Sequence, residues 1–116
     1  MTSNFKWLKI IFFILSIETI IKNINEIKEL LQQNKTDLIN RYNLRSIALF
    51  GSITRNEATS KSDVDILVEF EKPIGLDFVL LADELETILG VKVDLVTPKA
   101  LKPKMFEFIK QDLQYV

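Results

Sequence analysis

Three aspartates and a Gly-Ser pair are the residues of this chain whose types and spacing could do chemistry. Gly51-Ser52 is followed, after ten residues, by Asp63-Val64-Asp65, and Asp94 lies in the later run VKVDLV. Side chains two residues apart in a strand lie on the same face, so Asp63 and Asp65 are predicted to project together. Magnesium is usually held by one or two carboxylates together with substrate phosphates. The pair therefore predicts a metal site for a nucleoside triphosphate.

Gly51 and Ser52 are predicted to bind phosphate. A strand that ends in Gly and runs straight into a helix lets backbone N–H groups approach an anion without an intervening Cβ. Ser52 adds a hydroxyl, and Arg55 lies one helical turn further on, where its guanidinium could make a bidentate phosphate contact. A plainer interpretation makes Arg55 a surface ion-pair partner of Glu57 or Glu18.

Asp94 is predicted to be the third carboxylate of the site. A lone Asp inside an apolar strand is costly unless it is hydrogen-bonded, paired or bound to a metal. The alternative is an edge-strand residue that pairs with Lys92 or Lys99. For the other two aspartates the alternative is that Asp63 caps a turn and Asp65 is a solvated edge residue.

Composition limits the remaining chemistry. The 116 residues are enough for one domain, and the absence of Cys and His excludes zinc knuckles, thiol nucleophiles and the usual serine or cysteine triads. Fifteen basic and sixteen acidic residues give a net charge of −1, so we expect no direct nucleic-acid binding. Nothing in the composition requires an oxidising compartment, and we expect a cytoplasmic protein.

The elements that must position these residues follow from apolar spacing and from Gly and Pro breaks. Helices are predicted up to about residue 33, from a cap at Thr36-Asp37 to about Tyr42, over 52–58, over 76–89 and over 105–113; strands are predicted over 46–51, 63–70 and 91–96. This order predicts an α/β (α+β) fold, with a small mixed sheet of three or more strands flanked by helices.

The apolar segment from Leu8 to Ile21 is predicted to be a helix that packs on the core or on a partner. Its uninterrupted apolar run is about eight residues, whereas a membrane-spanning helix needs about 20. Glu18 follows the run, and no cleavage site of a secretory signal is present. The alternative is a membrane anchor or a leader segment. We expect no membrane association, a helical N-terminal extension over residues 1–23 and a catalytic domain over residues 24–116.

The stretches IALFGSITRNEATSKSDVDILVEF and VDLVTPKALKP resemble a known family. Gly-Ser, ten residues, Asp-x-Asp and a later Asp is the pattern of the nucleotidyltransferase superfamily that includes DNA polymerase β. More narrowly, residues 24–116 resemble the minimal nucleotidyltransferase (MNT) domain proteins of bacteria and archaea. Many of these are encoded beside a HEPN-domain ribonuclease, as the antitoxin of a type VII-like HEPN–MNT toxin–antitoxin pair.

The resemblance implies a polymerase β-like fold and a magnesium-dependent protein adenylyltransferase. It implies that Asp63, Asp65 and Asp94 hold two Mg²⁺ ions and that Gly51 and Ser52 bind the β and γ phosphates of ATP. AMP would be transferred to a Tyr hydroxyl of the HEPN toxin. The chain departs from the family where Thr54-Arg55-Asn56 replaces a small residue followed by Arg-Gly, although Asn tolerates positive φ.

Two other functions stay open from the sequence. One is an antitoxin without catalysis, which neutralises the toxin by covering it with the N-terminal helix or with the Lys-rich segment from Lys99 to Lys110. The other is a nucleotidyltransferase for small molecules or RNA that a partner subunit completes.

Overall fold

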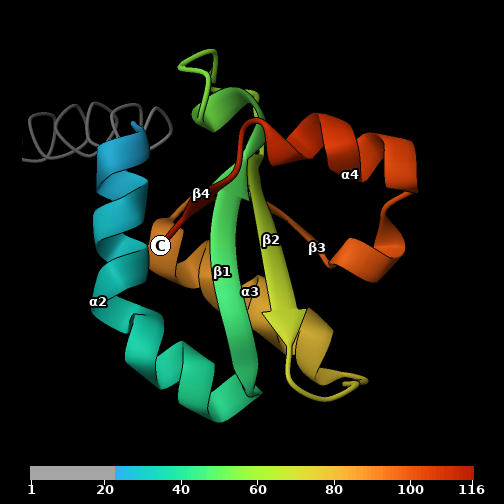
Figure 1. Ribbon diagram of the computed structural model, residues 1–116. Helices are drawn as coiled ribbons and strands as arrows, with labels where there is room; N and C mark the ends of the chain where they lie inside the picture. Colours follow the sequence, from blue (N-terminus) through green and yellow to red (C-terminus); the bar gives the residue numbers. More distant parts are fainter. Residues whose placement is uncertain (1–22) are drawn as a thin grey trace, which may run out of the picture.

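A mixed four-stranded sheet organises residues 23–116, the part of the chain that the computed structural model describes (Figure 1). The strands are β1 (Leu44–Phe50), β2 (Val64–Phe70), β3 (Val93–Val96) and β4 (Gln114–Tyr115), in the spatial order β3-β2-β1-β4. Strand β1 is antiparallel to β2 and β4, and β2 is parallel to β3. The parallel pair is joined through helix α3 (Asp77–Leu89), as parallel strands require a crossover. The predicted small mixed sheet flanked by helices is confirmed.

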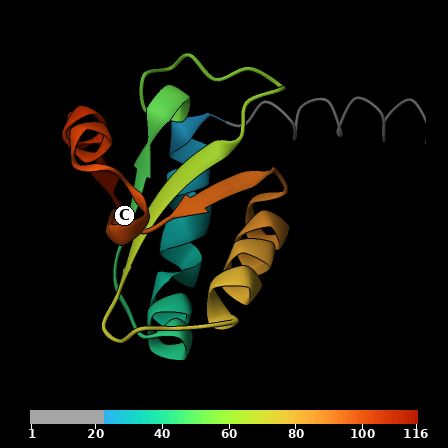
Figure 2. The ribbon, with the colours of Figure 1, turned by 90° about the vertical axis from the view of Figure 1, so that its right-hand side faces the viewer.

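Helices cover both faces of the sheet, as Figure 2 shows. Helices α2 (Ile24–Tyr42) and α3 pack on one face, and α4 (Pro103–Lys110) packs on the other. Alternate residues of β1 serve the two faces, because successive side chains of a strand point to opposite sides. Ile47 and Leu49 belong to the larger core beneath α2 and α3, whereas Ala48 and Phe50 contact the smaller cluster beneath α4.

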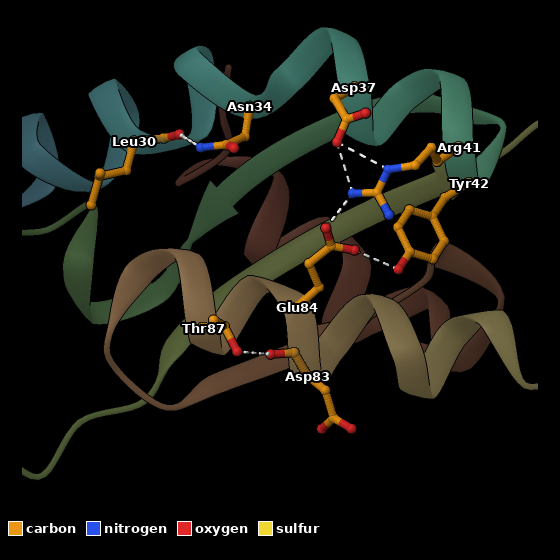
Figure 3. Close-up of polar contacts among 8 residues, drawn as sticks. All are labelled: Leu30, Asn34, Asp37, Arg41, Tyr42, Asp83, Glu84 and Thr87. Atoms are coloured by element: carbon orange, nitrogen blue, oxygen red, sulfur yellow. Dashed lines mark hydrogen bonds and ion pairs between the residues drawn. The ribbon is translucent and has the colours of Figure 1, made fainter.

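Helix α2 is continuous from Ile24 to Tyr42, so the predicted break at Thr36-Asp37 is wrong. Asp37 does not cap a helix; its carboxylate accepts hydrogen bonds from Arg41 one turn later, and Arg41 also contacts Glu84 of α3 (Figure 3). The Tyr42 hydroxyl donates to Glu84 at 2.6 Å. The apolar stripe also continues through the predicted break, because Leu31, Leu38 and Tyr42 are all buried.

Two predicted helices are shorter than expected. Residues 52–58 do not form an α-helix: a 3₁₀ turn, η1 (Gly51–Ile53), is followed by turns and loop, and Asn56 has a φ of 57°. At the C-terminus, α4 ends at Lys110 rather than near residue 113, and the last residues form β4, which periodicity did not predict. Helix α3 is confirmed, including its end at Gly90, which has a φ of 67°.

A second 3₁₀ turn, η2 (Pro98–Ala100), connects β3 to α4. The predicted helix between Leu8 and Ile21 lies outside the described residues. From residue 23 onward, no helix has the length and apolar character needed to cross a bilayer.

Candidate functional site

The three predicted carboxylates come from neighbouring strand ends on one face of the sheet. Asp65 in β2 lies in register with Asp94 in β3. Both side chains lie on the face that α4 covers, because Leu67 and Val96, two residues further along each strand, pack beneath α4. Asp63 directly precedes β2. The parallel pairing therefore brings together residues that are 29 positions apart in the sequence.

Asp65 is the carboxylate at the centre of this group. The pKa of Asp65 is raised from 3.8 to about 6, chiefly by partial burial and then by the negative charges of the nearby Asp94 and Asp63. The positive charge of Arg55 acts in the opposite direction. Since each neighbouring carboxylate opposes ionisation of Asp65, a bound cation would relieve the repulsion.

Gly51 lies directly against Asp65. Phe50 and Asp65 are partners in the β1–β2 ladder, and the chain turns at Gly51 with a φ of 78°. A Cβ built on Gly51 would lie 2.2 Å from Oδ2 of Asp65 and 3.2 Å from its Cγ. Glycine is therefore required here for two reasons: the left-handed backbone conformation and the close approach of the carboxylate.

The turn η1 places Ser52 beside this carboxylate pair. The Gly51 carbonyl accepts hydrogen bonds from the backbone N–H groups of Thr54 and Arg55 and from the Thr54 hydroxyl, which lies 2.8 Å away. The N–H of Glu57 donates to the Ser52 carbonyl. These bonds fix a tight turn in which the first N–H groups have no acceptor within the turn itself. The predicted phosphate-binding pair therefore stands on a short turn instead of a helix.

Arg55 is held by two carboxylates. Its Nε donates to Glu57 at 3.1 Å and its Nη1 contacts Asp112 at 2.5 Å. The Glu57 pairing considered from the sequence is thus present, and Glu18 lies outside the described residues. Asp112, just beyond α4, was missed, since a lone acidic residue after a helix has no spacing signal that connects it with Arg55. The guanidinium bridges the η1 turn and the end of α4.

The carboxylates fit a hard cation that shares its ligands with a substrate. Asp94 is exposed, and within residues 23–116 it forms no ion pair with Lys92 or Lys99. In the same range, no three acidic side chains are gathered closely enough to form a finished metal centre. Magnesium commonly takes only one or two protein carboxylates and completes its shell with phosphate oxygens and water. Asp65 with its two acidic neighbours suits that kind of incomplete site.

A surface pocket of about 700 Å³ lies at the other end of the strands, away from the carboxylates. Its walls include Arg45 from the start of β1, Phe70 from the end of β2 and Thr97 after β3. Arg45 is already paired with Glu71 at 3.2 Å. The candidate metal and phosphate ligands therefore do not line this pocket.

Comparisons with known proteins agree with this geometry. Residues 24–116 match the nucleotidyltransferase domain family. A relative from Methanocaldococcus jannaschii, named as a candidate protein adenylyltransferase, is 52% identical over 97 residues, which are 82% of this chain and 99% of the relative. The protein adenylyltransferase MntA of Thermococcus cleftensis is 42% identical over 94 residues, which are 80% of this chain and 95% of MntA.

Solved structures share the fold. A candidate minimal nucleotidyltransferase superposes with a TM-score of 0.66 at 32% identity, over 78% of this chain and 95% of that chain. A chain of a toxin–antitoxin complex crystallised with AMP-PNP superposes with a TM-score of 0.59 at 26% identity, over 81% of this chain and 72% of that chain. The sheet and its covering helices are thus the fold of minimal nucleotidyltransferases.

Proposed function

Because the chain belongs to the nucleotidyltransferase domain family, we propose that it is a protein adenylyltransferase and the antitoxin of a HEPN–MNT pair. It transfers AMP from ATP to a tyrosine hydroxyl of the cognate HEPN ribonuclease toxin and thereby neutralises the toxin. The names of the relatives support this activity, and the toxin–antitoxin complex with AMP-PNP supports a toxin as the partner. The observation that carries the proposal is the pairing of Asp65 with Asp94 directly behind Gly51.

Asp63, Asp65 and Asp94 would hold two Mg²⁺ ions, which supply charge stabilisation for the triphosphate and lower the pKa of the acceptor hydroxyl when bound. Asp94 is exposed, so its carboxylate can reach the acceptor and take the hydroxyl proton. Asp65 is half-buried against Gly51, which fixes its orientation. Asp65 is thus the fixed carboxylate of the three, whereas Asp63 and Asp94 are more accessible to solvent and substrate.

Gly51 and Ser52 would hold the β and γ phosphates through backbone N–H groups and the Ser52 hydroxyl. Arg55 joins them when phosphate displaces one of its carboxylate partners, Glu57 or Asp112. During transfer, the bond between the α-phosphorus and its bridging oxygen breaks, a bond to the tyrosine oxygen forms, and pyrophosphate leaves. No His is needed, because carboxylates and charge stabilisation carry each step.

A separate protein as substrate suits the size and charge of the chain. Residues 24–116 form a single small domain, and the net charge of −1 does not favour polyanions. Because the reaction consumes ATP, we place the protein in the cytoplasm.

The test is AMP transfer to the HEPN protein encoded beside this chain. The chain is incubated with that protein, Mg²⁺ and ATP labelled at the α-phosphate, and the modified residue is identified by mass spectrometry. The double variant Asp63→Asn, Asp65→Asn should fold but lose transfer by more than about 100-fold. The matched control Asp77→Asn, Asp83→Asn removes the same charge from the exposed surface of α3 and should retain activity. Chelation with EDTA should abolish transfer by the unaltered chain.

Three other outcomes would overturn parts of the proposal. A tight complex without label would identify an antitoxin that acts by covering the toxin. Label on a small acceptor or on RNA would identify a different nucleotidyltransferase. Full transfer by the Asp63→Asn, Asp65→Asn variant would refute the metal assignment.

A further inference from the structure

The outer side of α4 carries two large apolar side chains that are more than half exposed. Met105 is 53% exposed and Phe108 is 68% exposed. They are three residues apart, so they lie on one side of the helix. The inner side is occupied by Phe106 and Ile109, which pack beneath α4 on the sheet. Helix α4 therefore has a second apolar face in addition to the face that anchors it.

Lysines are concentrated in α4 and just before it. Between residues 99 and 110 there are four lysines and one glutamate, although the whole chain has a net charge of −1. All four lysines are exposed, and within residues 23–116 none of them forms an ion pair: Lys99, Lys102, Lys104 and Lys110. A segment that combines exposed apolar side chains with unneutralised positive charge is complementary to a protein surface that has an apolar pocket and acidic residues nearby.

The position of α4 connects this face with the candidate active site. Helix α4 covers the sheet face that carries Asp65 and Asp94, and it lies next to the η1 end of β1 in Figure 1. Just after α4, Asp112 contacts Arg55, which follows the η1 turn. A protein bound to the outer side of α4 would therefore be a neighbour of the reacting groups.

We propose that Met105, Phe108 and the exposed lysines of residues 99–110 form the docking surface for the protein substrate, which presents acidic residues around an apolar pocket. The proposal rests on the proposed function and adds to it the surface that recognises the acceptor. Docking here holds the acceptor hydroxyl near the carboxylates and raises its effective concentration.

A second exposed apolar group provides a matched control. Leu76, Val79 and Leu80 at the start of α3 are 81%, 55% and 55% exposed. They belong to the helix on the opposite face of the sheet from α4, as Figure 2 shows. Replacing two exposed apolar residues by Ser in either helix removes apolar surface, but only the residues of α4 lie on the proposed interface.

The experiment compares Met105→Ser, Phe108→Ser with Val79→Ser, Leu80→Ser in the full chain. The α4 variant should raise the KM for the neighbouring HEPN protein by about tenfold or more, because buried apolar anchors dominate protein interfaces. The KM for ATP should stay unchanged, and the α3 variant should behave like the unaltered chain. Lys102→Glu with Lys110→Glu should also raise the KM for the HEPN protein and weaken its dependence on salt.

Photo-crosslinking separates docking from catalysis. A benzoylphenylalanine at position 108 should crosslink to the HEPN protein, and one at position 79 should not. Crosslinking at 108 without AMP transfer would refute the proposed activity but support the docking surface. Transfer that the α4 variants leave unchanged, or crosslinking only at 79, would refute the docking surface alone. Binding of the chain to phosphatidylglycerol vesicles that depends on Phe108, with no crosslink to the HEPN protein, would assign the face to a membrane and overturn the proposal.

Discussion

At Gly51, a single added methyl group tests how closely the turn and the carboxylate fit together. Gly51→Ala would place a Cβ 2.2 Å from Oδ2 of Asp65 and would force a residue with a side chain to keep a φ of 78°. We expect a loss of about 100-fold in kcat/KM, because a displacement near 1 Å in a catalytic group has effects of this size. The left-handed conformation itself costs about 1–2 kcal/mol of folding free energy. Steady-state kinetics and thermal unfolding measure the two effects.

Gly75→Ala is the control for that substitution. No atom lies within 4 Å of a Cβ at Gly75, so both activity and melting temperature should stay near those of the unaltered chain. If Gly51→Ala were as active as Gly75→Ala, Gly51 and Asp65 would not form one rigid site.

Asp65→Asn should stabilise the metal-free protein in a pH-dependent way. The pKa of Asp65 is raised from 3.8 to about 6, so the folded chain binds more protons than the unfolded chain between these values. The unaltered protein therefore loses stability as the pH rises from about 4 through the folded pKa of about 6, and the loss is complete once the pH is well above that pKa. The Asn variant lacks this loss, so its advantage in melting temperature should grow across that range and then stay constant.

Thermal unfolding in EDTA at several pH values tests this prediction, and added Mg²⁺ should stabilise only the unaltered chain at pH 7. The variant Asp77→Asn, in which an exposed carboxylate of α3 is replaced, is the matched control. An advantage of Asp65→Asn that shrinks as the pH rises would contradict the assigned repulsion.

At the level of elements, the ion pair between Arg55, after η1, and Asp112, after α4, should limit how readily Arg55 binds a phosphate. Asp112→Asn removes one of its two carboxylate partners. If the guanidinium binds phosphate, the KM for ATP should fall by a factor of about two to five, since exposed ion pairs are weak. The effect should disappear when Arg55→Gln is also present, which a double-mutant cycle measures. An equal effect with and without Arg55 would show that Arg55 is not a phosphate ligand.

The sequence predicts these elements unevenly, for physical reasons. Helix α3 and the strands that carry Asp65 and Asp94 follow from apolar periodicity and from Gly90, which are local signals. The break at Thr36-Asp37 was wrong because an Asp within a helix can pair with Arg41 one turn later as well as cap an end. Strand β4 has two residues, too few for any periodicity.

The candidate site also combines local features, which the sequence can predict, with contacts between distant segments, which it cannot. The residue types and the spacing from Ser52 to Asp63 are local, so the sequence alone suffices to nominate these groups as candidates. The register of Asp65 with Asp94 and the contact between Arg55 and Asp112 join distant segments, and they depend on how the sheet and α4 assemble. Spacing alone does not contain such contacts.

For the molecule as a whole, one face of the sheet mainly supports the fold and the other carries the candidate site. The face beneath α2 and α3 carries the larger hydrophobic core, whereas the face beneath α4 carries the carboxylates beside a smaller cluster. A small cluster constrains the chain less than a large core does. The candidate catalytic carboxylates therefore lie on strands that are held in place mainly by the core on the opposite face.

Among the residues that the structure describes, all members of the larger core lie within residues 24–116, so we expect that the domain can fold without the preceding residues. Helix α2 begins with its own cap, because Asn23 Oδ1 accepts the N–H of Glu26 at 2.9 Å, and the family match starts at residue 24. We propose that residues 1–22 are an extension, so a chain that starts at Asn23 should unfold within about 2 °C of the full chain and transfer AMP at a similar rate. Asn23→Ala in the shortened chain should cost about 1 kcal/mol, because the cap is lost. Calorimetry and the transfer assay test both expectations; a shortened chain that cannot fold would place residues 1–22 within the domain.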